Sequence, residues 1–379
     1  MIIKLIIVVA LFAITLGIAA YLTLMERKVA AWMQDRIGPD RAGPFGLLQP
    51  LADGGKMFFK EDFRPANADK WLFIIGPGIA MFTSLITGAV IPWGPDLKIA
   101  GESIALQVAD VNVGILFIMG VVSIGVYGIM IGGWASNNKF ALFGAIRASS
   151  QMISYELAMG VSVITIVLMT GSLSLRDIVD QQHGFWNDGW FSWNVFKQPV
   201  CFVVFLITAL AECNRAPFDL PECESELIGG YHTEYGAMKL GFFLFAEYVN
   251  MFISCAVISA LFFGGYNFPG MDHFSGNTLA ILGTLVFFGK TFFFIFVFMW
   301  IRWTLPRFRY DQLMHIGWKK MIPVALINLL ITGVVIAYTS GWFSKDKDNE
   351  SAGTAKTEQP LGLNQSFEKT SQTGIAYRY

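Results

Sequence analysis

Charged residues are scarce in this chain: Asp, Glu, Lys and Arg make up 15% of its 379 residues, against about 25% in an average soluble domain. Hydrophobic residues reach 54%. A soluble chain of this size cannot bury so much apolar surface, so the composition predicts a membrane protein. The net charge is only -1 and no block of like charges resembles a basic arm, which excludes nucleic acid as a partner.

Cysteine is also sparse, and so are the motifs of soluble enzymes. The four cysteines are Cys201, Cys213, Cys223 and Cys255. They contain no C-x-x-C pair and no histidine at zinc-ligand spacing, so we interpret them as buried or half-buried thiols. We expect no metal or flavin in this chain. The sequence has no P-loop, nucleophile elbow or H-E-x-x-H motif, and the glycines of GPGIAMF at 76–82 are better explained by helix packing or a kink.

Eight apolar runs are long enough to cross the roughly 30 Å of hydrocarbon in a bilayer. They lie at 2–25, 71–92, 111–133, 151–170, 194–212, 240–264, 278–303 and 321–340. The first run exceeds the roughly 7–15 apolar residues of a signal peptide, so we expect it to be retained. The sequence therefore predicts an all-α polytopic membrane protein with about eight transmembrane helices in a single domain over 1–340. A polar tail, mobile or surface-lying, follows at 341–379.

The distribution of Lys and Arg predicts the orientation of these helices. The loops after the first, third, fifth and seventh runs hold seventeen such residues, whereas the N-terminus and the other loops hold four. The positive-inside rule places the first set in the cytoplasm and both termini outside. In the first cytoplasmic loop, the stretch after Pro50 mixes apolar and charged residues, which predicts an amphipathic helix at the membrane surface.

Three glutamates stand inside or at the edge of apolar runs, where a charge is costly and normally faces a cavity or a partner. They are Glu156, Glu212 and Glu247, and the predicted topology places all three near the cytoplasmic side. Carboxyls at similar depth on three helices can line a proton route. The alternative is that each carboxylate pairs with Arg147, Arg215 or a backbone group.

Two further features extend this pattern. The segment APFDLPECESEL beside Glu212 carries four acids that form either a funnel into the membrane or a solvated acidic surface; they are Asp219, Glu222, Glu224 and Glu226. Lys290 lies in the middle of the seventh run, where it must meet a carboxylate, a carbonyl or water. Glu247 is one possible partner for it.

Four long stretches resemble one known family. They are ERKVAAWMQDRIGPDRAGPFGLLQPLADGGKMFFKE at 26–61, NKFALFGAIRASSQMISYE at 138–156, AECNRAPFDLPECESELIGGYHTEYGAMKLGFFLFAEY at 211–248 and WTLPRFRYDQLMHIGWK at 303–319. They are similar to the NuoH/ND1 family of membrane subunits of respiratory complex I, the proton-pumping NADH:quinone oxidoreductase. The resemblance covers essentially the whole chain up to the tail.

The resemblance implies a subunit that is not catalytic alone. It joins the hydrophilic arm, with its iron–sulfur subunits, to neighbouring membrane-arm subunits, and forms much of the chamber that binds ubiquinone or menaquinone. The family's proton route would correspond here to Asp53, Glu156, Glu212, Glu222, Glu224, Glu226 and Glu247. The chamber lining would correspond to Arg27, Arg36, Arg147, Tyr155, Arg215 and Tyr248.

The chain departs from the family pattern at Cys213 and Cys223, and its tail is longer than usual. Membrane-bound hydrogenases carry a related subunit, although the first loop is more similar to the quinone-reducing branch. An ion-coupled secondary transporter and a structural anchor are the other classes that fit buried acids in a helical bundle. We expect a bacterial inner membrane rather than a mitochondrial one.

Overall fold

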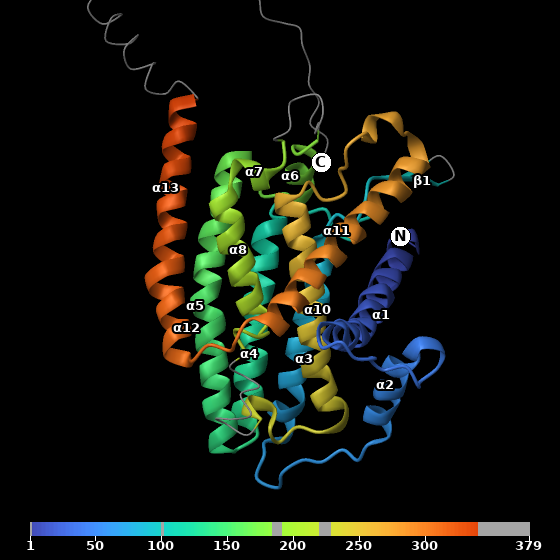
Figure 1. The fold of residues 1–379 in the computed structure, drawn as a ribbon, viewed down its shortest axis with the longest axis vertical. Helices are drawn as coiled ribbons and strands as arrows, with labels where there is room; N and C mark the ends of the chain where they lie inside the picture. The colour runs from blue at the N-terminus through green and yellow to red at the C-terminus, as the bar shows by residue number, and fades with distance from the viewer. Residues whose placement is uncertain (1, 100–101, 184–191, 220–228, 340–379) are drawn as a thin grey trace, which may run out of the picture. The chain divides into compact units, whose positions relative to one another are not determined.

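The computed structural model describes residues 2–99, 102–183, 192–219 and 229–339, and the described residues up to Thr332 form a bundle of helices (Figure 1). The long helices are α1 (Ile2–Met33), α3 (Lys70–Thr87), α4 (Gly114–Ala135), α5 (Lys139–Thr170), α10 (Ala237–Phe262), α11 (Gly276–Thr304) and α13 (Ile322–Thr339). The shorter helices are α2 (Gln49–Phe59), α6 (Leu175–Asp180), α7 (Asn194–Lys197), α8 (Pro199–Glu212) and α12 (Tyr310–Ile316). A small antiparallel hairpin, β1 (Leu97–Ile99) and β2 (Glu102–Ile104), pairs Leu97 with Ile104.

The fold class predicted from sequence is confirmed. Within the described residues, seven helices are long and apolar enough to span a membrane, and α8 is a shorter apolar helix of 14 residues. At 1.5 Å per residue α8 is about 21 Å long, less than the hydrocarbon thickness. The expected fifth span starts with the separate turn α7, because Pro199 at the first position of α8 follows Gln198 in a non-helical conformation (φ −136°, ψ 61°). Proline disfavours helical geometry in the residue before it.

Two helices extend well beyond the apolar runs that predicted them. Helix α1 continues to Met33 through the charged residues after Met25. Helix α5 begins at Lys139, where the Asn138 side chain caps it by accepting a hydrogen bond from the Phe140 amide at 2.9 Å. Glu156 therefore lies near the middle of α5, which corrects its expected place less than two turns from the start. A hydropathy pattern shows only where the apolar run begins. The helix itself begins at the capping residue, which lies further upstream.

The amphipathic helix expected in the first loop is α2, and its two faces differ as predicted. Pro50, Asp53, Gly54 and Met57 follow the i, i+3, i+4, i+7 spacing of a single helix face, and all four line one cavity of the bundle. Phe59 lies outside that face and is 95% exposed. The helix therefore turns the face that carries Asp53 to the protein and leaves Phe59 on its outer side.

Helix α10 is the centre of the bundle and packs against α1, α3, α8 and α11. The neighbouring pair α3 and α4 is held together by small residues. A Cβ atom added to Gly76 would lie 2.9 Å from the Cα of Gly132, a distance that only glycine allows. This confirms helix packing as the role of Gly76.

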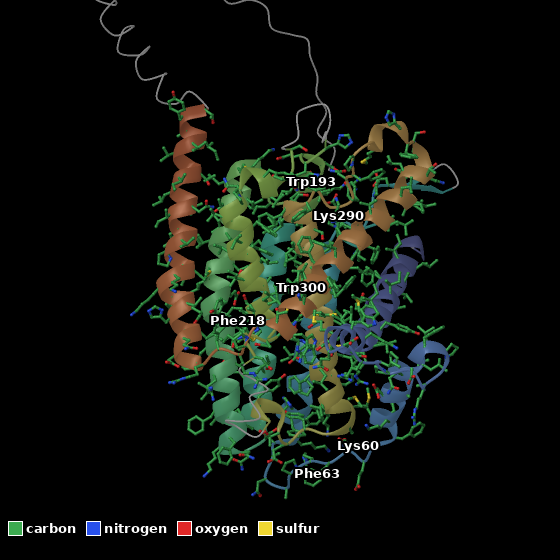
Figure 2. All side chains as sticks on the ribbon, in the orientation of Figure 1. Lys60, Phe63, Trp193, Phe218, Lys290 and Trp300 are labelled. Carbon is green, nitrogen blue, oxygen red and sulfur yellow. The ribbon has the colours of Figure 1, made fainter. Side chains whose placement is uncertain are left out.

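Polar contacts divide the loops into two groups at opposite ends of the bundle. At one end, Asp62 pairs with Lys239 at 2.9 Å, and Asn138 donates to Glu234 at 2.6 Å. Figure 2 shows Lys60 and Phe63 at this end, with Trp193 and Lys290 toward the other. These are the lysine- and arginine-rich loops, so the charge bias coincides with one face of the protein. That this face is cytoplasmic and both termini lie outside stays a prediction.

Residues Met1–Thr332 form one compact unit, and Gly333–Tyr379 form a second. The described part of the second unit is the C-terminal end of α13. The tail at 341–379 lies outside the described residues, so its predicted mobility is untested.

Candidate functional site

A cavity of about 170 Å³ opens between α1, α2 and α10, and we call it the arginine cavity. Its charged and aromatic lining residues are Arg27, Asp53, Arg215, Phe245, Glu247, Tyr248 and Arg302. Ala20, Thr23 and Arg27 reach it from one face of α1, since they follow one another by three and four residues. Arg27 and Asp53 are joined by an ion pair of 2.9 Å that ties α2 to α1.

The segment after α8 delivers Arg215 to this cavity. The chain turns at Asn214, which adopts a left-handed φ of 49° that asparagine tolerates better than most residues. The buried amide of Gln151 on α5 then holds the segment by donating to the carbonyls of Ala211 at 3.0 Å and Phe218 at 2.6 Å. Arg215 is consequently 5% exposed and fixed between α1 and α10.

Glu26 is the centre of the charge network beside the arginine cavity. Its carboxylate lies 3.3 Å from Arg215 Nη1 and also pairs with Arg302. Arg215 further lies 3.9 Å from Glu247 Oε2, and its guanidinium lies 4.1 Å from the Tyr248 ring centroid. Two buried acids and two arginines thus balance one another, an arrangement in which the loss of one member leaves an uncompensated buried charge.

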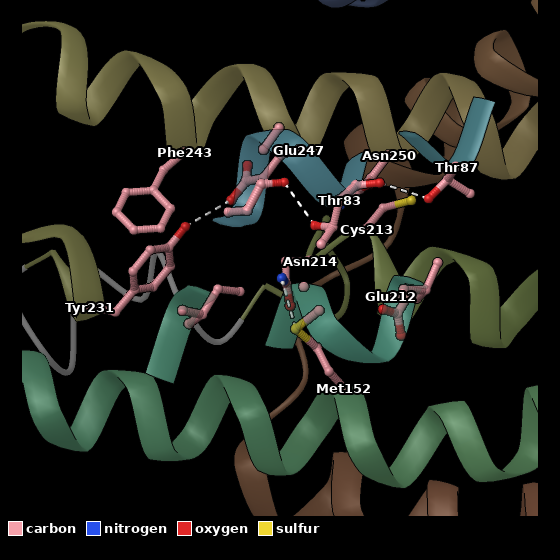
Figure 3. Close-up of a pocket in the computed structure, with 15 residues that line it drawn as sticks. Thr83, Thr87, Met152, Glu212, Cys213, Asn214, Tyr231, Phe243, Glu247 and Asn250 are labelled. Atoms are coloured by element: carbon pink, nitrogen blue, oxygen red, sulfur yellow. Dashed lines mark hydrogen bonds between the residues drawn. The ribbon is translucent and has the colours of Figure 1, made fainter. Parts of the chain in front are cut away.

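A second, smaller cavity shares the lining residue Glu247 with the arginine cavity, and we call it the glutamate cavity (Figure 3). It has a volume of about 30 Å³, room for about two water molecules. Its polar lining residues are Thr83, Thr87, Glu212, Asn214, Tyr231, Glu247 and Asn250. Glu247 and Asn250 are three residues apart and so share one face of α10. Tyr231 donates a hydrogen bond of 3.5 Å to Glu247 Oε1.

Glu247 therefore lines both cavities, and Glu212 stands at the far end of the second. Glu212 is the last residue of α8 and is 5% exposed. Its Oε2 atom accepts no hydrogen bond from the described part of the chain. Glu212 also lines a third, largely apolar cavity, and it interacts electrostatically with Glu156, which accepts a hydrogen bond from Ser123 on α4.

Comparison with known proteins identifies the family of this chain. A family model described as NADH dehydrogenase matches residues 5–333. The chain belongs to the NADH dehydrogenase family. Among its relatives, an H subunit of NADH-quinone oxidoreductase from Cytophaga hutchinsonii is 64% identical and is aligned over 88% of this chain and 96% of its own length.

Two further relatives share that description. The H subunit of NADH-quinone oxidoreductase from Flavobacterium johnsoniae is 59% identical over 88% of this chain and 95% of its own length. An H subunit of the same enzyme from Geobacter metallireducens is 50% identical over 86% and 94%. The resemblance seen in the sequence motifs is thus confirmed.

The structure brings together six of the residues predicted from the family motifs. Arg27, Asp53, Arg215, Glu247 and Tyr248 line the arginine cavity, and Glu212 lines the glutamate cavity with Glu247. Glu156 lies beside Glu212 without lining either cavity. Glu222, Glu224 and Glu226 lie outside the described residues, as does Cys223.

Three predicted chamber residues lie apart from these cavities. Arg36 is exposed and donates to Gln34 at 2.6 Å. Arg147 stacks on the Tyr310 ring at 5.6 Å. Tyr155 is fully buried and donates to the Leu313 carbonyl at 2.9 Å. A role for them in binding quinone stays a prediction.

Sequence reasoning missed one residue of the site and left the partners of two other residues open. The sequence pattern marks Glu26 only as the end of the first apolar run, although it precedes Arg27 in the family motif. Lys290 does not pair with Glu247, because its Nζ donates to the carbonyls of Phe263, Gly265 and Asn267. Asp219, the one described acid of its segment, forms an ion pair with Arg307 at 2.7 Å.

Metal ligands are not gathered anywhere in the described residues: no three of His, Cys, Asp or Glu are grouped to hold an ion. Cys201, Cys213 and Cys255 are buried free thiols. Burial raises the pKa of the Cys213 thiol, just after α8, to about 12, so this thiol is protonated and unreactive at neutral pH.

Proposed function

We propose that the arginine cavity forms part of a quinone-binding chamber and that Glu247 and Glu212 begin a proton route leading from it, in a membrane subunit of NADH-quinone oxidoreductase. Membership of the NADH dehydrogenase family and the names of the relatives support the assignment to that enzyme. The observation that carries the proposal is the sharing of Glu247 by both cavities.

The lining of the arginine cavity suits a quinone head group. Such a ring presents carbonyl oxygens that accept hydrogen bonds, and Arg27, Arg215 and Arg302 supply donors beside the aromatic ring of Tyr248. At about 170 Å³ the cavity is smaller than the roughly 300–1,000 Å³ of a typical ligand pocket. A neighbouring subunit is therefore expected to complete the chamber.

The two glutamates suit proton movement. Reduction of a quinone to a quinol takes up two electrons and two protons, and the carboxyl of Glu247 can release a proton toward the arginine cavity. Glu212 can replace that proton through the small polar cavity between them, whose volume admits water. The nearby pairs of Glu26 with Arg215 and Arg302 respond to any change of charge at Glu247, because Arg215 contacts both acids.

The same proposal includes the substrate, the partner subunits and the membrane. The substrate is ubiquinone or menaquinone, and the partners are the iron–sulfur subunits of the hydrophilic arm and the adjacent membrane-arm subunits. The chain is an integral membrane protein, and the bacterial sources of its relatives support a bacterial inner membrane. The three relatives reported above are named as subunits of NADH-quinone oxidoreductase. Their names favour this function over an independent ion-coupled transporter or a hydrogenase subunit.

The change Glu212→Gln tests the proton route in the assembled complex. An amide keeps the shape of the carboxyl but cannot carry a proton at this position, so coupled proton movement during NADH oxidation should fall by about tenfold or more. Proton uptake and quinone reduction are measured together in membrane vesicles.

Glu234→Gln is the matched control, because Glu234 accepts a hydrogen bond from Asn138 at the same end of the bundle but lines neither cavity. Normal coupled turnover in an assembled Glu212→Gln complex would refute the relay role. Loss of assembly would instead favour a structural role for this carboxyl.

A further inference from the structure

The turn between α10 and α11 surrounds the ammonium group of Lys290 with backbone oxygens. Lys290 Nζ donates to the carbonyl of Phe263 at 2.7 Å, of Gly265 at 2.9 Å and of Asn267 at 2.6 Å. An ammonium group has three N–H donors, so these three carbonyls satisfy it completely. The Trp193 ring covers a further side, with its centroid 4.7 Å from Nζ, and Figure 2 shows the two side chains close together.

The carbonyls are held in place by contacts that do not involve Lys290. Gly264 and Gly265 have φ values of +69° and +53°, which glycine adopts without strain. The Gly264 amide donates to Gln182 Oε1 at 3.0 Å, and the Asn267 side chain donates to the Val179 carbonyl at 2.6 Å. These contacts hold the turn independently of the lysine side chain.

We propose that the turn at 263–267 is a receptor for a primary ammonium group, that Lys290 is its tethered occupant, and that a free alkylammonium ion can replace it when the side chain is shortened. Backbone carbonyls that converge on one point replace the hydration shell of a cation. The receptor also lies at the C-terminal end of α10, where the helix dipole favours positive charge.

The occupant fixes the position of α10, which carries Glu247. Without the ammonium, three carbonyls of a turn whose residues 264–267 are buried would lose their hydrogen-bond partner, which is costly for a buried polar group. Lys290 is accordingly a positioning residue for the site around Glu247. Its effect on turnover rests on the proposed function, whereas its effect on the stability of the complex does not.

The test uses Lys290→Ala in the intact, purified complex. Alanine keeps Cβ, so propylammonium replaces the deleted atoms from Cγ to Nζ. We expect propylammonium to raise the thermal midpoint of the variant in a concentration-dependent manner and to restore about half or more of the lost quinone reductase activity. Tetramethylammonium at equal ionic strength should do neither, because it has no N–H donor.

Lys98→Ala is the matched control, since Lys98 is exposed at the same end of the bundle and its complex should not respond to propylammonium. An equal response of Lys290→Ala to both ions, or none to either, would overturn the proposal. If Lys290→Ala does not assemble, Lys290→Arg and Lys290→Met decide: we expect arginine, which supplies donors, to permit assembly and methionine to prevent it. Any other result for that pair overturns the proposal.

Discussion

Glu26 offers the sharpest test of the charge network beside the arginine cavity. The change Glu26→Gln removes the negative charge that Arg215 and Arg302 share. The Arg215 side chain is only 6% exposed, and in the described part of the chain Glu247 would still lie 3.9 Å from it. Removing one partner of a buried ion pair costs about 3–5 kcal/mol.

The lower end of that range applies here. Glutamine keeps an acceptor oxygen, and Arg302 is 20% exposed and can reach water. A cost of about 3 kcal/mol corresponds to somewhat more than 100-fold in an equilibrium constant. Without Glu26, Arg215 and Arg302 lose the carboxylate that holds their donors at the cavity. Part of that energy is then missing from quinone binding, so we expect the KM for a short-chain quinone to rise by about tenfold to 100-fold.

The assay measures kcat and KM for quinone in the solubilised complex, with electron input checked by an artificial acceptor that does not use the quinone site. Asp62→Asn is the control, since Asp62 is 59% exposed and pairs with Lys239 away from the cavity. The double change of Glu26→Gln with Arg302→Gln should raise the thermal midpoint of the complex above that of Glu26→Gln alone, because it restores the charge balance. A KM within about twofold of the wild type in an assembled Glu26→Gln complex would refute this reasoning.

Two further predictions concern stability. Gly76→Ala should destabilise the α3–α4 pair by about 1–3 kcal/mol, because the added Cβ would lie 2.9 Å from the Gly132 backbone. Gly78→Ala is the control and should not destabilise the protein, since no atom lies within 4 Å of its added Cβ. Equal thermal midpoints for the two variants would contradict this prediction. In the loop after α10, burial and a hydrogen bond to Asp180 raise the pKa of Tyr266. Its folded-state pKa is above the unfolded value, so the stability it contributes is full below about pH 10 and declines as pH rises further. The difference in thermal midpoint between the wild type and Tyr266→Phe should shrink above that pH, and a constant difference would refute the prediction.

The sequence was sufficient to locate seven of the eight expected spans and the acids within them. Glu247 is recognisable because a carboxylate inside an apolar run must face a cavity or a partner, and the structure places it between two cavities. The amphipathic helix α2 follows from its mixture of apolar and charged residues, whereas Asp53 was reached through the family motifs. Arg27 and Arg215 were reached through the family motifs rather than from their surroundings.

Other features depend on contacts between distant segments, which the sequence does not reveal. Glu26 resembles the polar end of a span because charges follow it, yet α1 continues to Met33 and places the carboxylate beside Arg215 and Arg302. The partners of Lys290 are backbone carbonyls, which have no signature in the side-chain pattern. The hairpin at 97–104 has strands of only three residues, too short for an alternating pattern to be recognised.

The position of Glu247 in the wall between two cavities has a thermodynamic consequence. If an occupant of the arginine cavity changes the affinity of Glu247 for a proton by some factor, then protonation of Glu247 changes the affinity for that occupant by the same factor. The two quantities are one coupling free energy measured from either side. The dependence of quinone affinity on pH therefore reports the strength of this coupling at equilibrium, without any proton having to cross the membrane.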